Sequence, residues 1–256
     1  MRSMFLAHGS PMNALADNEY TRFLNQLGKN LSPEAILIIS AHWESDFLTL
    51  TRTDGIYETI YDFYGFPKEL YDVQYPARGS ATVADMVADQ LASSDFLCSI
   101  DETRGMDHGS WTLLKHLFPN ADVPVVQMSL NANLEAEEQI CLGQALQGLK
   151  DSNLLVIGSG VTVHNLRLLD WNKGFDALPE PWAVEFDDWL LANSSLHRLK
   201  QLEAYLQLAP NARKAAPTLE HFVPYLIARG AGFSPEPKVL QRSYEMGSLS
   251  YMSVEF

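Results

Sequence analysis

Short apolar runs alternate with amphipathic stretches along most of the chain. Continuous apolar runs are typical of strands covered on both faces, and they predict strands at 4–7, 35–39, 47–51, 125–130 and 154–157. Apolar residues spaced three and four apart predict helices at 18–31, 80–91, 109–117 and 134–149, the last one capped by Asn133. This alternation predicts one α/β domain over residues 1–256, with a largely parallel central sheet flanked by helices.

The second half of the chain has a more helical pattern. Residues 181–206 are predicted to be mostly helical, and a further helix is predicted at 218–228 with Thr218 as its cap. Residues 240–256 predict two strand-like runs around Glu245-Met246-Gly247. No internal repeat or shift in composition marks a boundary between domains, which favours a single domain.

Five of the seven histidines lie in short motifs beside Gly, Ser or aromatic residues: His8, His42, His108, His164 and His221. The first two directly follow predicted strands, and the carboxyl ends of parallel strands line the crevice where open α/β sheets bind ligands. Neutral imidazole is also the most common metal ligand in proteins. The five histidines therefore predict a mononuclear metal site at this edge of the sheet. The alternative is that each ring only satisfies hydrogen bonds locally.

The individual motifs leave some roles open. His221 is predicted to lie on a helix beside Glu220, and adjacent helical residues point about 100° apart, so only one of the two can be a third ligand. His164 follows Gly158-Ser159-Gly160, which we interpret as a flexible turn after a buried strand. His108 is expected at a helix N-terminus, where a capping role for Asp107 and His108 is the alternative. The other two histidines, His116 and His197, are interpreted as packing or surface residues.

Composition narrows the class of protein. The formal net charge is −14 and no basic stripe offsets it, which argues against nucleic acid or an anionic membrane as partner. No apolar run is long enough for a signal peptide or a membrane span. Cys98 and Cys141 lie in apolar stretches and are expected to be buried free thiols, so a cytoplasmic protein is predicted. Motifs of serine hydrolases, nucleotide-binding proteins and thermolysin-like enzymes do not occur in the sequence.

Residues 61–67 contain four aromatic rings with Gly and Pro between them, which favours a loop that forms a flat wall for an aromatic ligand. Together with seven other motifs, this loop resembles the DODA-type, LigB-like class III extradiol dioxygenases, a group that includes the 4,5-DOPA dioxygenases. The motifs occur in the family's order over essentially the whole chain: HGSPMN at 8–13, SAHW at 40–43, YDFYGFPKELY at 61–71, YPARGS at 75–80, DHGSW at 107–111, VHNL at 163–166, PWAVEFDDWL at 181–190 and EMGSLSYMSV at 245–254.

The resemblance implies roles for the motif residues. It implies that His8 and His42 are metal ligands and that His221 is the third, although better-known class III enzymes use Glu there and Glu220 stands beside it. His164 matches the acid–base histidine and is also expected as a fourth ligand in resting or zinc-loaded forms. His108 matches a second catalytic pocket histidine that contacts substrate or oxygen. The residues expected to bind substrate are Ser10, Asp107 and Tyr64.

The implied reaction is extradiol cleavage of a DOPA-like or caffeate-like catechol by O2 at a non-heme Fe(II) site, with Zn(II) expected in the purified protein. The substrates are then a small catechol and O2. Arg78 and Arg104 are candidates for binding a substrate carboxylate, because both are expected in loops near family motifs. Two alternatives stay open: a zinc-dependent hydrolase, and a non-catalytic binding protein on the same fold.

Overall fold

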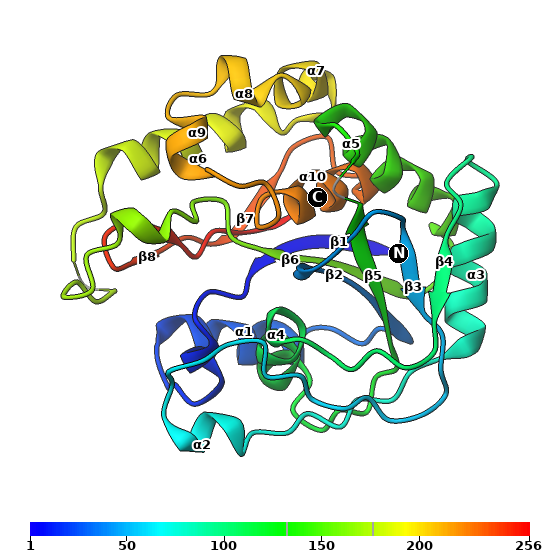
Figure 1. Ribbon diagram of the computed structural model, residues 1–256. Helices are drawn as coiled ribbons and strands as arrows, with labels where there is room; N and C mark the ends of the chain where they lie inside the picture. Colours follow the sequence, from blue (N-terminus) through cyan, green and yellow to red (C-terminus); the bar gives the residue numbers. More distant parts are fainter. Residues whose placement is uncertain (132, 176) are drawn as a thin grey trace.

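Four parallel strands form the centre of the sheet (Figure 1). In spatial order they are β5 (Val125–Asn131), β2 (Ala35–Ser45), β6 (Leu154–Gly160) and β1 (Arg2–Ala7). The computed structural model describes residues 1–131, 133–175 and 177–256. The predicted α/β fold with a largely parallel sheet is confirmed.

Shorter strands extend this sheet to eight, in the order β4-β3-β5-β2-β6-β1-β10-β7. β3 pairs antiparallel with β5, while β10 pairs antiparallel with both β1 and β7. These outer strands are β3 (Thr49–Thr51), β4 (Ser99–Asp101), β7 (Lys238–Gln241) and β10 (Ser253–Glu255). A separate hairpin pairs β8 (Tyr244–Glu245) with β9 (Leu249–Ser250).

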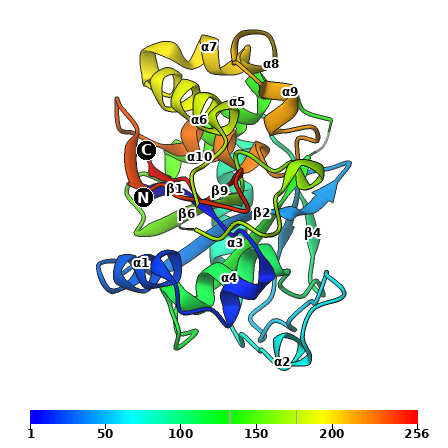
Figure 2. The ribbon, with the colours of Figure 1, turned by 90° about the vertical axis from the view of Figure 1, so that its left-hand side faces the viewer.

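Helices cover both faces of the sheet, which explains why the central strands are apolar at consecutive positions. Along β2, Ile36 and Ile38 belong to the core under one helical layer, whereas Leu37 and Ile39 belong to the core on the opposite face. The first layer holds α1 (Glu19–Lys29) and α4 (His108–Leu117). The opposite layer holds α3 (Ala81–Ala92), α5 (Ala136–Ala145) and α10 (Val223–Ala231) (Figure 2).

Shorter helices complete the structure. Outside α10, a third core is built on α6 (Pro181–Asn193), α7 (Leu199–Glu203), α8 (Tyr205–Leu208) and α9 (Ala212–Ala215). The remaining short elements are α2 (Lys68–Tyr71) and the 3₁₀ helices at Pro11–Ala14, Leu146–Leu149, Leu166–Leu168 and Leu196–Arg198. No helix in the part of the chain that the structure describes is both long and apolar enough to cross a membrane.

Several predicted boundaries were wrong. The helix predicted at 218–228 begins only at Val223, where Pro224 suits the first turn because that turn needs no backbone N–H donor. The helix predicted from 134 begins at Ala136, and Glu135 forms its capping box with Glu138 in place of the predicted cap. The helical stretch at 181–206 is broken into the 13-residue helix α6, a 3₁₀ helix, α7 and α8, and the C-terminal segment forms four short strands.

The glycines before His164 are part of β6 and do not form a flexible turn. A Cβ atom on Gly160 would lie 2.2 Å from the backbone oxygen of His221, and one on Gly158 would lie 2.2 Å from that of Pro224. The glycines therefore allow the segment that carries His221 to approach the strand closely.

Candidate metal centre

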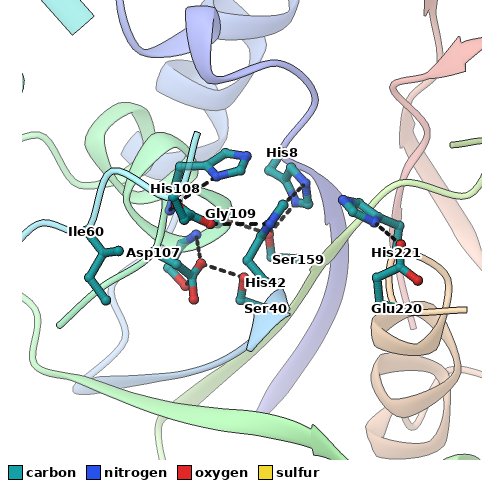
Figure 3. Close-up of polar contacts among 12 residues, drawn as sticks. His8, Ser40, His42, Ile60, Asp107, His108, Gly109, Ser159, Glu220 and His221 are labelled. Atoms are coloured by element: carbon teal, nitrogen blue, oxygen red, sulfur yellow. Dashed lines mark hydrogen bonds and ion pairs between the residues drawn. The ribbon is translucent and has the colours of Figure 1, made fainter. Parts of the chain in front are cut away.

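The five motif histidines converge at the carboxyl edge of the parallel strands, and Figure 3 shows His8, His42, His108 and His221. His8 directly follows β1, and its backbone N–H still donates to Gly160 on β6 at 3.2 Å. His42 lies inside β2, which is longer than predicted. There the register against β5 shifts between Ile39 and Glu44. This bulge gives the strand an irregular stretch at the site, a common device for directing side chains.

Two histidines reach the same point from outside the strands. His221 lies in the turn before α10, not on the helix as predicted, and its carbonyl accepts a hydrogen bond from Val161 at 2.8 Å. His108 is the first residue of α4, which Asp107 caps by accepting from the backbone N–H of Ser110. The prediction that His108 lies at the N-terminus of a helix is therefore confirmed.

The ring nitrogens of His8, His42 and His221 form a tight group, all within 4.8 Å of one another. The Nε2 atoms of His8 and His42 are 3.1 Å apart. Two nitrogens that each lie about 2.1 Å from one ion are separated by about 3.0–3.4 Å at octahedral to tetrahedral angles. The spacing of this pair therefore fits two ligands of a single metal ion.

Hydrogen bonds at the other ring nitrogen define the tautomer of His8. Its Nδ1 lies 3.0 Å from the hydroxyl oxygen of Ser159, and that hydroxyl donates its own proton to the carbonyl of Gly109. Ser159 must then accept from His8, so Nδ1 carries the proton and Nε2 keeps its lone pair.

Carboxylates act in the same way on the other two rings. Nδ1 of His42 lies 3.3 Å from Asp62, and Nδ1 of His221 lies 3.1 Å from Glu220. A carboxylate accepts only, so both rings present an unprotonated Nε2. Two such lone pairs repel each other at 3.1 Å unless a cation lies between them. The donor set therefore fits a metal ion.

Burial keeps these imidazoles neutral. It lowers the pKa of His8 well below the ordinary histidine value, and the neighbouring rings add to this effect. Burial also lowers the pKa of His221, although the hydrogen bond to Glu220 acts in the opposite direction. Burial, reinforced by the nearby His108 and His221, lowers the pKa of His42 to about 2. The pKa of His164 is lowered to about 3, again mainly by burial. Neutral imidazole is the form that binds a metal.

The structure separates the two candidates for third ligand. His221 joins the group with His8 and His42, whereas Glu220 accepts from the His221 ring and from the hydroxyl of Thr218 at 2.9 Å. Burial alone would raise the pKa of Glu220, but the hydrogen bonds from His221, from its own backbone N–H and from Thr218 together outweigh burial and lower the pKa to about 2. Glu220 is thus an ionised partner that orients His221.

His164 has a different position from the three grouped rings. Its ring stacks on that of His221, with centroids 3.5 Å apart and planes 12° apart, and it also lines the cavity. Its nitrogen groups with His221 and Glu220 and not with His8 and His42 in the described structure. This arrangement leaves His164 at the edge of the group as a neutral proton acceptor.

Asp62 is a functional residue that sequence reasoning missed. Its carboxylate lies 3.3 Å from Nδ1 of His42 and 2.9 Å from Nδ1 of His108, and it accepts from the backbone N–H of His108 at 3.0 Å. One carboxylate therefore lies against both rings. The only signal in the sequence was its position as a carboxylate in the middle of the aromatic run at 61–66.

The histidines open into a cavity of about 580 Å³. Most of its other lining residues are apolar, and they are Gly9, Pro11, Met12, Phe63, Phe66, Leu166, Leu169, Trp171, Met246 and Leu249, with Ser10 and Glu245 as the polar members. The predicted aromatic wall is thus present, and Ser10 lies where a substrate-binding residue would. Next to neutral nitrogen ligands, such a cavity suits a flat, largely apolar ligand.

Four other predicted positions do not line this cavity. Tyr64 is 92% exposed, because the loop turns its ring to solvent while Phe63 and Phe66 face inward. Asp107 is 1% exposed and is fully engaged as a cap and as a partner of Ser40 and Arg104. Neither residue therefore lines the cavity in this structure.

The candidate arginines are engaged elsewhere. Arg78 donates to the backbone oxygen of Asp54 at 2.7 Å, and Arg104 lies over the ring of Trp43 while contacting Asp107 at 3.1 Å. The prediction of a carboxylate-binding arginine in the cavity was therefore wrong.

The remaining histidines and cysteines are outside the site. His116 is buried and its Nε2 lies 2.7 Å from the carbonyl of Asn13, while His197 is exposed, as a packing and a surface residue should be. Cys98 and Cys141 are free thiols as predicted, but Cys141 is exposed and only Cys98 is partly buried.

Comparison with known proteins adds independent findings. A family model described as the catalytic LigB subunit of aromatic ring-opening dioxygenase matches residues 3–255. The 4,5-DOPA dioxygenase extradiol of Escherichia coli K12 is 39% identical, covering 100% of this chain and 94% of its own length. The protein of the same name from Beta vulgaris is 38% identical over 99% of this chain and 96% of its own. The crystal structure of an uncharacterized E. coli K12 protein superimposes with a TM-score of 0.83 at 34% identity, covering 100% of this chain and 99% of the other.

Proposed function

This chain belongs to the LigB family of aromatic ring-opening dioxygenases, and on that premise we propose that it cleaves a DOPA-like or caffeate-like catechol in the extradiol manner. The reaction would use O2 at a mononuclear Fe(II) ion held by His8, His42 and His221. The names of the relatives from E. coli and Beta vulgaris support a DOPA-type substrate.

The observation that carries the proposal is the pair of facing Nε2 atoms, 3.1 Å apart, at the inner end of an apolar cavity. Three neutral nitrogen ligands leave coordination positions open for substrate. The ion, when bound, supplies the redox chemistry that lets O2 react with an aromatic ring.

The chain's own residues bind the ring and handle its protons. Phe63 and Phe66 line the cavity, with ring centroids 5.3 Å apart and planes at 79° to each other. His164, which lines the cavity and stacks on the His221 ring, accepts a proton from a catechol hydroxyl. His108, held by Asp62, contacts the substrate or oxygen from the opposite side of the group.

The metal itself is part of the proposal. Fe(II) is the working ion, and Zn(II) is the ion expected in the purified protein, since an all-histidine set suits zinc equally well. The two free thiols support a location in the reducing cytoplasm.

The test is anaerobic loading with Fe(II), followed by addition of DOPA, caffeate or protocatechuate with O2. We expect stoichiometric oxygen uptake and a yellow ring-opened product. The Zn(II)-loaded protein is the control and should take up no oxygen. Absence of oxygen uptake with every catechol would refute the proposal, and ester or amide turnover by the zinc form without O2 would favour the hydrolase.

A further inference from the structure

One acidic side chain lines the cavity, and no lysine or arginine does so in the part of the chain that the structure describes. This residue is Glu245, on strand β8 of the short hairpin. The histidines that share the cavity are held as neutral metal ligands or by neighbouring carboxylates. Among the non-histidine residues that line the cavity in the described structure, the only charged side chain is therefore acidic.

Glu245 is joined to the metal-binding segment by a short chain of hydrogen bonds. It accepts from the hydroxyl of Tyr251 at 2.7 Å. That hydroxyl in turn accepts from the backbone N–H of Ser10 at 3.2 Å and from the amide of Asn13 at 3.1 Å, and Asn13 also donates to the carbonyl of His8 at 3.0 Å.

Gly9 makes this approach possible. Its φ of +60° lies in the left-handed region, and a Cβ atom there would lie 2.3 Å from the hydroxyl oxygen of Tyr251. The hydroxyl of Tyr251 thus links the carboxylate of Glu245 to the backbone N–H of Ser10, two residues after His8. This places it on the same wall as a metal ligand.

The carboxylate has spare capacity for a cation. Among the described residues its only side-chain partner is Tyr251, which occupies one carboxylate oxygen. Burial also raises the pKa of Glu245, so a positive charge beside it would be stabilising. Lys173 packs against Gly247 of the same hairpin, but its ammonium is paired with Glu180 at 2.9 Å.

We propose that Glu245 binds the ammonium group of the substrate, so that the enzyme prefers catechols that carry an amine over catechols that carry only a carboxylate. This inference rests on the proposed function for its catechol. It replaces the arginine–carboxylate contact expected from the sequence with the opposite charge pairing.

Three catechols that differ in their amine and carboxylate groups test the preference. DOPA is 3-(3,4-dihydroxyphenyl)propionate with an added amine, and dopamine lacks the carboxylate altogether. We expect kcat/KM of the Fe(II) enzyme to be about tenfold or more higher for DOPA and dopamine than for the propionate, the size expected for a hydrogen bond between charged groups. Equal values for the three substrates in the wild type would overturn the proposal.

The variant Glu245→Gln removes the charge while its amide oxygen can still accept from Tyr251. We expect it to lose the preference, so that the ratio of kcat/KM for each amine to kcat/KM for the propionate falls to about one in this variant. Glu236→Gln is the matched control, because this exposed glutamate contributes the same charge outside the cavity. Retention of the full preference in Glu245→Gln would contradict the proposal.

Binding without turnover separates this inference from the proposed reaction. Dopamine and the propionate are titrated into the metal-loaded protein without O2, and quenching of tryptophan fluorescence is followed, since Trp171 lines the cavity. Tighter binding of dopamine that disappears in Glu245→Gln supports the subsite even if no catechol is cleaved. Equal binding of the two ligands overturns it even if ring cleavage is observed.

Discussion

The inner end of the cavity and its mouth are built on different principles. At the inner end each ring is oriented by a polar partner, as Ser159 orients His8 and Glu220 orients His221. At the mouth, Phe66 is held by packing against the core, and Trp171 is 69% exposed. Metal ligation requires fixed directions of lone pairs, whereas accommodating a flat ring requires only shape.

This contrast predicts that substitutions at the inner end reduce turnover by orders of magnitude, while substitutions at the mouth change substrate affinity a few fold. The following experiments test it, beginning with the largest effect.

Removal of a grouped histidine should have the largest effect. We expect His42→Ala and His221→Ala to lose bound metal and more than about 100-fold in kcat/KM, beyond the range seen for partners of metal ligands. Metal content by mass spectrometry and oxygen uptake measure both. His197→Ala, at an exposed position, should behave as wild type. If Glu220→Ala loses the metal while His221→Ala keeps it, the third ligand is misassigned.

His164→Ala should separate catalysis from metal binding. We expect kcat to fall by about 10²- to 10⁴-fold, the usual cost of removing a general acid–base group, while the metal content stays at the wild-type level. Loss of the metal in this variant would show instead that His164 is a fourth ligand.

Asp62→Asn tests the carboxylate that sequence reasoning missed. It removes the negative partner of His42 and His108, so we expect a loss of about 10- to 100-fold in metal affinity or kcat. Asp72→Asn, an exposed aspartate ten residues along the same loop region, is the control. Equal activity of both variants would show that Asp62 does not orient the rings.

The buried histidines should also make the metal-free protein sensitive to acid. Their folded pKa values are lowered, to about 2 for His42 and about 3 for His164, mainly by burial. The unfolded chain therefore takes up protons first as the pH falls below about 6.5, and each such histidine lowers the free energy of unfolding by about 1.4 kcal/mol per pH unit.

Urea unfolding of the metal-free protein over this pH range measures the effect. In the variant His164→Asn, the slope of the free energy of unfolding against pH should be smaller by about 1.4 kcal/mol per pH unit. An unchanged slope would mean that His164 is protonated in the folded protein.

The smallest effects are expected at the mouth. Phe63 packs against the His108 ring at a centroid distance of 5.6 Å, so Phe63→Ala should raise KM roughly two- to tenfold with little change in kcat. Its neighbour Tyr64 is 92% exposed, and Tyr64→Ala should stay within about twofold of wild type. Steady-state kinetics with one catechol measure KM of both variants. A larger effect of Tyr64→Ala than of Phe63→Ala would mean that the loop changes conformation when substrate binds.

The sequence by itself determined the layers of the fold and the identity of the reactive side chains. Consecutive apolar residues such as Ile36–Ile39 have one physical explanation, a strand covered on both faces, and local pattern is enough to detect it. Histidines directly after such strands must meet at one edge, which is why His8 and His42 were correctly placed in one site.

Only the tertiary structure decided which side chains hold these rings and which line the cavity. Asp62 contacts the rings of His42 and His108, which other elements supply. Glu220 contacts the ring of His221, which lies in a turn that was predicted as helix. The loop at 61–67 shows the same limit, since a turn of its backbone sends Phe63 inward and Tyr64 to solvent although both rings have equal aromatic character. Side-chain direction in a loop depends on backbone angles that distant contacts impose, and no local pattern of polarity encodes them.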